Sequence, residues 1–233
     1  MNKQSPALAG LLLAVAAAGA QAQASCDSDG QPRPLGLLER FISADCETCW
    51  TDAATPRPRR GELALDWITA GSRGEDAPLS TAVSRDSPAR LQALGRAAPA
   101  RAEAVHRRAD LPGHKMRVAH GLAFNGYIGA SIELKPGRGG PWQAWLLLVE
   151  TLPPGTEGSP VERNLVRNAI QPAWDVPAPL SKAQQRRLFE SRPMSIPEGA
   201  DPERLRVVGW VEDARGRIRA IAQSRCVARP GQG

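Results

Sequence analysis

The chain has 233 residues, of which 42% are apolar and 23% are charged, a composition typical of a folded globular protein. Its 22 glycines and 21 prolines are too dispersed for a collagen or for a wholly disordered chain. The formal net charge is +6, but the basic residues form no long run of the kind that nucleic-acid-binding proteins carry, so we expect no nucleic-acid partner.

Residues 1–24 are predicted to be a secretory signal peptide. Lys3 supplies the positive start, residues 7–20 form an apolar run rich in Leu and Ala, and small residues before Ser25 suit cleavage. An apolar run of about 14 residues is too short to span a bilayer comfortably. The mature protein is therefore expected in the periplasm or outside the cell, without a stable membrane anchor.

The first half of the mature chain alternates predicted strands and helices. Residues 35–42 and 63–68 are short apolar-rich runs that favour strands. Residues 50–54 could form one or two helical turns, and a helix is expected to begin at Pro88, capped by Asp86 or Ser87. A further helix is expected over residues 100–109. The order β-α-β-α predicts an α/β domain over residues 25–116.

From about residue 117 the pattern changes to that of an antiparallel β domain. Alternating apolar residues around Asn125-Gly126 favour a strand or a hairpin. A buried strand is expected over residues 142–152 and a hairpin over residues 205–224, while residues 161–170 fit strand or helix and residues 181–190 a short helix. We predict a β-sandwich-like domain over residues 117–226 and a flexible tail over residues 227–233.

The mature chain contains four cysteines: Cys26, Cys46, Cys49 and Cys226. An exported protein meets an oxidising environment, where cysteines tend to pair, and four cysteines allow three connectivities. Cys46 and Cys49 are close enough in sequence to close a small ring. By elimination, this pairing leaves a disulfide between Cys26 and Cys226.

The C-x-x-C pair is the sharpest motif. A predicted strand leads into Cys46 at the start of a predicted helix, where backbone N–H groups can stabilise a thiolate. Cys46 would then be the nucleophile, and Cys49 would resolve the mixed disulfide. Asp45 and Glu47 flank Cys46, and their negative charges would oppose thiolate formation.

Glu39, Phe41, Ser43, Cys46 and Cys49 together resemble the opening motif of a family of secreted bacterial proteins of unknown function. That family has a thioredoxin-like N-terminal domain followed by a β-rich domain, and residues 145–150, 163–170 and 206–222 stand where its later strands would fall. The resemblance implies an α/β thioredoxin-like domain followed by an antiparallel β-sandwich-like domain.

A thioredoxin-like site also needs a cis-proline that faces the cysteines. Pro112 is the candidate, because no other proline lies between Pro99 and Pro136. Arg40 departs from the family pattern, since it stands where thioredoxins keep a buried acid. The resemblance thus names Cys46, Cys49 and Pro112 as site residues.

Two classes of function remain open. The chain could be an exported thiol–disulfide oxidoreductase or redox partner that acts on a protein thiol or disulfide. Alternatively, both disulfides could be structural, in a non-catalytic envelope or binding protein. No cofactor and no metal are expected, because the sequence has no second C-x-x-C and only the histidines His106, His114 and His120, of which His114 and His120 lack the spacing of a zinc-binding helix. The sequence leaves the oligomeric state open.

Overall fold

The computed structural model describes residues 26–110, 113–175 and 181–226. The predicted signal peptide, Pro112 and the predicted tail therefore lie outside the described residues. Within the described ranges, no helix combines the length and the apolar character needed to cross a membrane.

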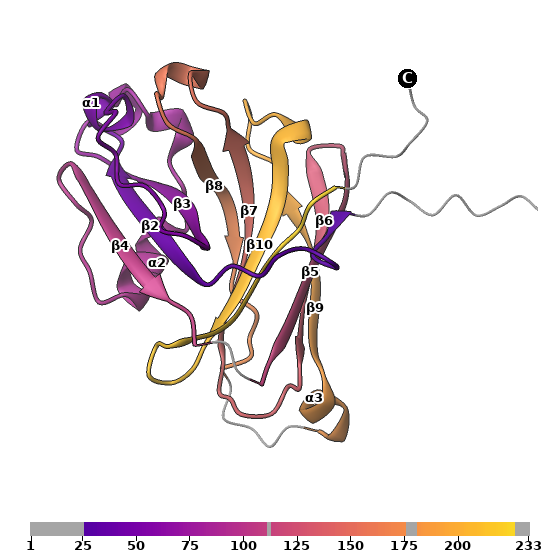
Figure 1. Cartoon of the computed structure of the whole chain (residues 1–233). Helices are drawn as coiled ribbons and strands as arrows, with labels where there is room; N and C mark the ends of the chain where they lie inside the picture. The colour runs from indigo at the N-terminus through magenta and orange to yellow at the C-terminus, as the bar shows by residue number, and fades with distance from the viewer. Residues whose placement is uncertain (1–25, 111–112, 176–180, 227–233) are drawn as a thin grey trace, which may run out of the picture.

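The described residues form eleven strands and three short α-helices (Figure 1). The strands are β1 Cys26–Asp27, β2 Gly36–Ser43, β3 Glu62–Thr69, β4 Ala102–Arg108, β5 Lys115–Phe124, β6 Tyr127–Lys135, β7 Gln143–Leu152, β8 Arg163–Ile170, β9 Leu188–Ser195, β10 Leu205–Glu212 and β11 Ile218–Gln223. The helices are α1 Glu47–Trp50, α2 Ser87–Ala93 and α3 Lys182–Arg186, and 3-10 turns occupy Gly74–Asp76, Ser80–Ala82, Thr156–Gly158 and Pro202–Arg204.

The strands form two sheets, and this arrangement overturns the predicted α/β thioredoxin-like fold. The larger sheet has the order β11-β10-β7-β8-β3-β2-β4 and the smaller one β1-β5-β6-β9. Within the larger sheet, β3 is parallel to β2 and to β8, and the other neighbours are antiparallel. Strands from both halves of the chain thus share one sheet, and the expected boundary between residues 116 and 117 falls inside β5. The protein is mostly β.

The clearest local error is the helix expected over residues 100–109. Alanine, glutamate and arginine favour helices intrinsically, but Ala102–Arg108 instead forms β4, which pairs antiparallel with β2 along seven residue pairs. Val105 packs partly buried into the core beside α2. Pairing with the open edge of β2 therefore overrides the local helix propensity.

Other predicted elements are confirmed. β2, β3 and β7 lie where apolar runs predicted strands, and α2 begins at Ser87, one residue before the expected Pro88, with Asp86 at its N-cap. Asn125 and Gly126 have φ of 48° and 75° and close the β5–β6 hairpin. β10 and β11 form the hairpin expected in the last third of the chain.

Apolar side chains cover both faces of the larger sheet. One face packs against the smaller sheet through residues that include Val118, Ile132, Leu146, Leu148 and Val207. The opposite face packs under α2, which contributes Leu91 to a core rich in tryptophan. Trp142, Trp145 and Trp210 are buried, and Trp174 packs partly buried.

Gly209 on β10 lies directly against side chains of the smaller sheet. A Cβ atom there would stand 2.7 Å from Val118 Cγ1 and 2.9 Å from Ile132 Cδ1. We expect Gly209→Ala to lower the free energy of unfolding by about 1–3 kcal/mol through overpacking, as measured by urea denaturation. Gly129→Ala is the matched control, because no atom lies within 4 Å of its Cβ position, and it should change stability by less than about 0.5 kcal/mol. Equal losses in the two variants would contradict this packing.

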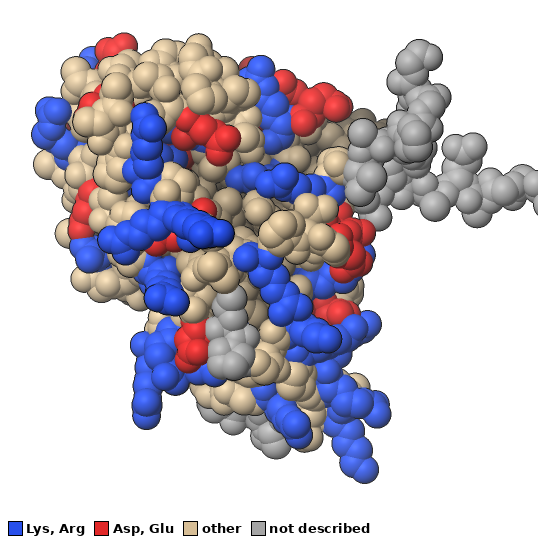
Figure 2. Space-filling model, in the orientation of Figure 1, with Lys and Arg blue, Asp and Glu red and all other residues tan. Residues whose placement is uncertain are grey.

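Charged side chains of both signs mix over much of the face shown in Figure 2, and basic ones gather toward its lower part. Lys135, Arg138, Lys182 and Arg186 line a shallow hollow at that end, beside α3. Glu133 pairs with Lys135 and Arg187 on the neighbouring surface.

Candidate functional site at the Cys46–Cys49 disulfide

Cys46 and Cys49 form a disulfide at the point where β2 ends and α1 begins. The turn is fixed by backbone bonds from Ala44 N to Thr69 O and from Cys46 N to Ser43 O. Cys46 occupies the N-cap position of α1, as expected, but α1 has only four residues. A single turn aligns few peptide dipoles, so stabilisation of a Cys46 thiolate by the helix is weaker than the sequence suggested.

The two cysteines of this disulfide differ in solvent exposure. Cys46 is only 5% exposed, whereas Cys49 is partly exposed and lines a pocket of about 330 Å³. The pocket wall also includes Thr48, Asp52, Arg40, Arg101 and Arg163. A molecule that enters this pocket therefore meets Cys49 and the exposed Arg101, while Arg40 and Arg163 are nearly buried in its wall.

A buried ion cluster forms the back of the pocket. Arg40 on β2 donates from Nη2 to Asp66 Oδ2 at 2.7 Å, and Arg163 on β8 approaches Asp66 Oδ1 with Nη1 at 3.2 Å. The Asn164 backbone N–H donates to Asp66 Oδ2 at 2.7 Å. All three charged side chains are nearly inaccessible to solvent, so two guanidinium groups share one carboxylate in the interior. The cluster has a surplus of positive charge.

Arg163 also holds α1 in place. Its Nη2 donates to Trp50 O at 2.6 Å, to Cys49 O at 3.3 Å and to Thr55 Oγ1 at 3.0 Å. Its guanidinium lies 4.8 Å from the centre of the Trp50 ring. Burial lowers the Arg163 pKa, Asp66 opposes that effect, and neighbouring Arg40 adds to it. The carbonyl end of α1 is thus capped by a cation from a strand more than a hundred residues away.

Asp45, the acidic residue that precedes Cys46, has hydrogen-bond donors of its own. The Asp45 carboxylate accepts bonds from Ser72 N, Ser72 Oγ and Arg73 N, and the Ser72 hydroxyl bond is the main cause of its lowered pKa. Asp45 therefore ties the cysteine turn to residues 71–73. Thr48 Oγ1 lies 3.5 Å from Cys46 Sγ and accepts a bond from Arg101 Nη2 at 3.3 Å.

The sequence did not identify Asp66, Arg101 or Arg163 as residues of this site. Asp66 and Arg40 did leave a signal, since each is a charge inside an apolar strand, where burial requires a partner. They are directly opposite each other in the β2–β3 register. Arg40 is thus buried, and the acid that pairs with it comes from the next strand.

The cis-proline expected at Pro112 lies outside the described residues. The cis peptide bonds that the described part of the chain contains precede Pro136 and Pro141. Neither proline is among the residues that line the pocket beside Cys49. The described residues therefore place no cis-proline against the disulfide.

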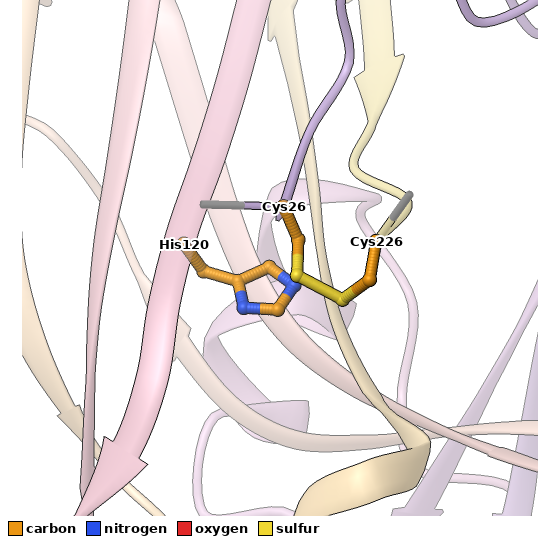
Figure 3. Close-up of side chains that lie close together, drawn as sticks. All are labelled: Cys26, His120 and Cys226. Carbon is orange, nitrogen blue, oxygen red and sulfur yellow. A yellow bond between two sulfur atoms is a disulfide. The ribbon is translucent and has the colours of Figure 1, made fainter. Parts of the chain in front are cut away.

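The second disulfide joins Cys26 to Cys226, across 200 residues of sequence. His120 on β5 lies beside it, and Figure 3 shows an edge of the imidazole ring directed at the Cys26 sulfur. His120 Nδ1 lies 2.9 Å from Gly121 O, and burial lowers the His120 pKa. The second disulfide is separate from the pocket at Cys49, because Cys26, His120 and Cys226 are not among the residues that line this pocket.

Comparison with protein-family models, with curated proteins and with solved structures finds no match to this chain.

Proposed function

We propose that this protein exchanges thiols and disulfides at Cys46–Cys49, as an oxidoreductase or as the redox partner of another protein. The observation that carries the proposal is the unequal solvent exposure of the two cysteines: Cys49 is partly exposed and lines a pocket, whereas Cys46 is buried. Thiol–disulfide exchange needs one sulfur within reach of the partner and a second held next to it. Because the sequence predicts export, we place the partner in the periplasm or outside the cell.

The exposure favours Cys49 as the attacked sulfur, which reverses the roles assigned from the sequence. An incoming thiolate bonds to Cys49 Sγ, the bond between the two protein sulfurs breaks, and its electron pair leaves on Cys46 as a thiolate. A second thiolate of the partner then attacks the mixed disulfide and releases Cys49. The partner's dithiol is oxidised to a disulfide, and the protein's disulfide is reduced.

The surroundings of the cysteines suit this reaction. The Thr48 hydroxyl, 3.5 Å from Cys46 Sγ, can donate a hydrogen bond to the departing thiolate. Arg101 donates to the Thr48 hydroxyl and lines the same pocket as Cys49, so the wall of this pocket carries a positive charge. Nearby cations lower thiol pKa values and thus raise the thiolate fraction. These charges come from Arg101, which immediately precedes β4, and from Arg163 on β8, both far from the cysteines in sequence.

The test is the alkylation rate of each cysteine in the reduced protein, followed by peptide mass mapping. We expect Cys49 to react roughly tenfold faster than Cys46, because reactivity follows exposure and thiolate fraction. With a soluble dithiol as reductant, the oxidised protein should accept one pair of electrons at this site. Cys49→Ser should abolish the exchange, and the double variant Cys26→Ser/Cys226→Ser should retain it. Faster labelling of Cys46 would contradict the assignment of Cys49.

A non-catalytic binding protein with structural disulfides is the second candidate. It is favoured by the contacts of Arg163, which fix the carbonyl groups of both Cys49 and Trp50. In that case neither sulfur would react with a dithiol while the protein stays folded. The same exchange experiment thus separates the two functions.

A further inference from the structure

Cys26, Cys226 and His120 form a group of potential metal ligands that the exchange reaction does not use. One ligand atom from each residue lies within 4.8 Å of the other two. The histidine ring stands beside the disulfide rather than across the sheet from it, as Figure 3 shows. Two sulfurs and one imidazole nitrogen in this arrangement are a donor set suited to a thiophilic metal ion.

The backbone holds the three residues together independently of the disulfide. Cys26 on β1 pairs directly with His120 on β5. Arg225, the neighbour of Cys226, donates its N–H to Asp27 O at 2.9 Å. Ser224 is bound to Val207 of β10 through its own N–H and through its hydroxyl. Breaking the S–S bond therefore leaves both sulfurs held close to the imidazole.

The imidazole has one nitrogen engaged and one available. Nδ1 donates to the Gly121 carbonyl oxygen at 2.9 Å, which fixes the tautomer with a lone pair on Nε2. His120 is 5% exposed, and its Nε2 has no hydrogen-bond partner among the described residues. A buried polar atom without a partner is costly, and a metal ion would satisfy it. The bond to Gly121 is also the outer-shell contact that ligating histidines usually make.

We propose that reduction of Cys26–Cys226 creates a zinc site with Cys26, Cys226 and His120 as protein ligands. An external dithiol supplies two electrons and two protons, which convert the disulfide to two thiols while the dithiol becomes a disulfide. Zn²⁺ then displaces the two thiol protons and binds both thiolates and His120 Nε2. Reoxidation of the pair would release the ion, so the site would hold metal only under reducing conditions.

Zinc fits the number and charge of these ligands. The group contains three ligating residues among those that the structure describes, and Cys226 lies exposed at its edge. Three protein ligands with a fourth position open to water is a common arrangement for zinc. Two thiolates and a neutral imidazole also balance the charge of one divalent ion.

The experiment uses the full chain with Cys46→Ser and Cys49→Ser, so that the remaining thiols are Cys26 and Cys226. After reduction, Zn²⁺ binding is measured by competition with a chromophoric chelator, and Co²⁺ reports thiolate ligation through its charge-transfer absorption. We expect one equivalent bound by the reduced protein and none by the oxidised protein. His120→Gln should weaken Zn²⁺ affinity at least about tenfold, and His106→Gln, whose imidazole pairs with Glu62, should leave it unchanged.

Four results would overturn the proposal. Reduced protein that stays folded by circular dichroism but gives no thiolate–Co²⁺ absorption lacks the site. Reduced protein that unfolds also lacks it, because the strands must hold the ligands in place. Equal Zn²⁺ affinity in His120→Gln and its parent would remove the histidine from the site. Binding of Cu⁺ without Zn²⁺ would contradict the assignment of the metal.

Discussion

Replacing Arg90 by alanine should lower the free energy of unfolding by about 3–5 kcal/mol, because it leaves buried carboxylates without their cation. Arg90 on α2 is fully buried. It donates to both oxygens of Glu39 at 2.7 and 2.6 Å and to Glu212 Oε1 at 2.9 Å. Its guanidinium also lies 5.1 Å from the Trp145 ring centre and 4.9 Å from that of Trp210. Alanine removes all of these contacts together.

The pH dependence of the Arg90→Ala loss identifies its cause. Burial would raise the Glu212 pKa, but Arg90, Arg107 and the Trp210 N–H together hold it below the ordinary value of 4.5. A lowered carboxyl pKa stabilises the fold above the unfolded pKa, and this stabilisation is lost as the pH falls through the folded pKa. Without Arg90 the depression weakens, so the variant has less of this stabilisation to lose. The gap between wild type and variant should therefore narrow on acidification below about pH 4.5.

Urea denaturation at several pH values measures both effects. Arg96→Ala is the matched control, because Arg96 pairs with Glu103 in a partly exposed position and should contribute less than about 1 kcal/mol. If the Arg90→Ala loss is as small as that of the control, Glu39 and Glu212 are not held by Arg90. If it is large but independent of pH, lost packing under α2 is the cause.

The strands that the sequence predicted best are those that their own side chains identify, without reference to a pairing partner. Trp145, Leu147 and Val149 of β7 face the core beside α2, and the alternate Leu146 and Leu148 face the smaller sheet. A strand buried on both faces is a continuous apolar run, so its identity does not depend on any distant partner. The β5–β6 hairpin could be predicted equally well, because Asn125-Gly126 favours the positive φ that its turn requires.

The fold class depended on pairings that no local pattern contains. β3 lies between β2 and β8, which begins about a hundred residues later in the chain. Strands and helices that alternate along the first half suggested a separate α/β domain. Instead β4 pairs with the edge of β2, and α2 packs against the tryptophan-rich face of the same sheet. Sheet partners separated by long stretches of chain decided the fold.

Of the candidate site, only the disulfide bonds could be predicted from the sequence. Proximity in sequence paired Cys46 with Cys49, and elimination paired Cys26 with Cys226; the structure contains both disulfides. Arg163 contacts the backbone carbonyl of Cys49, and His120 lies beside the Cys26–Cys226 sulfurs. Both side chains come from strands far away in sequence, so the surroundings of the cysteines could not be predicted from local residues. For the same reason, the local acids Asp45 and Glu47 dominated the expected electrostatics.

Removing the Cys26–Cys226 disulfide should destabilise the protein far more than removing Cys46–Cys49. The first bond closes a loop of 200 residues and the second a loop of three. In the chain-entropy model, the long loop restricts the unfolded chain by about 5 kcal/mol and the short one by about 2 kcal/mol. Both bonds join segments that hydrogen bonds already hold in place, so the entropy of the unfolded chain should set the difference between them.

The comparison uses Cys26→Ser/Cys226→Ser against Cys46→Ser/Cys49→Ser, each measured by thermal unfolding. For a chain of this size, 1 kcal/mol shifts Tm by about 2–4 °C, so the losses should be about 10–20 °C and 4–8 °C. The reduced wild type should match the sum of the two within experimental error, because the sites share no residues. A larger loss from Cys46→Ser/Cys49→Ser would mean that the short disulfide stabilises α1 and the Arg163 cluster directly. In that event the short disulfide would act mainly by stabilising the folded state. This result would favour a structural role for Cys46–Cys49 over a redox role.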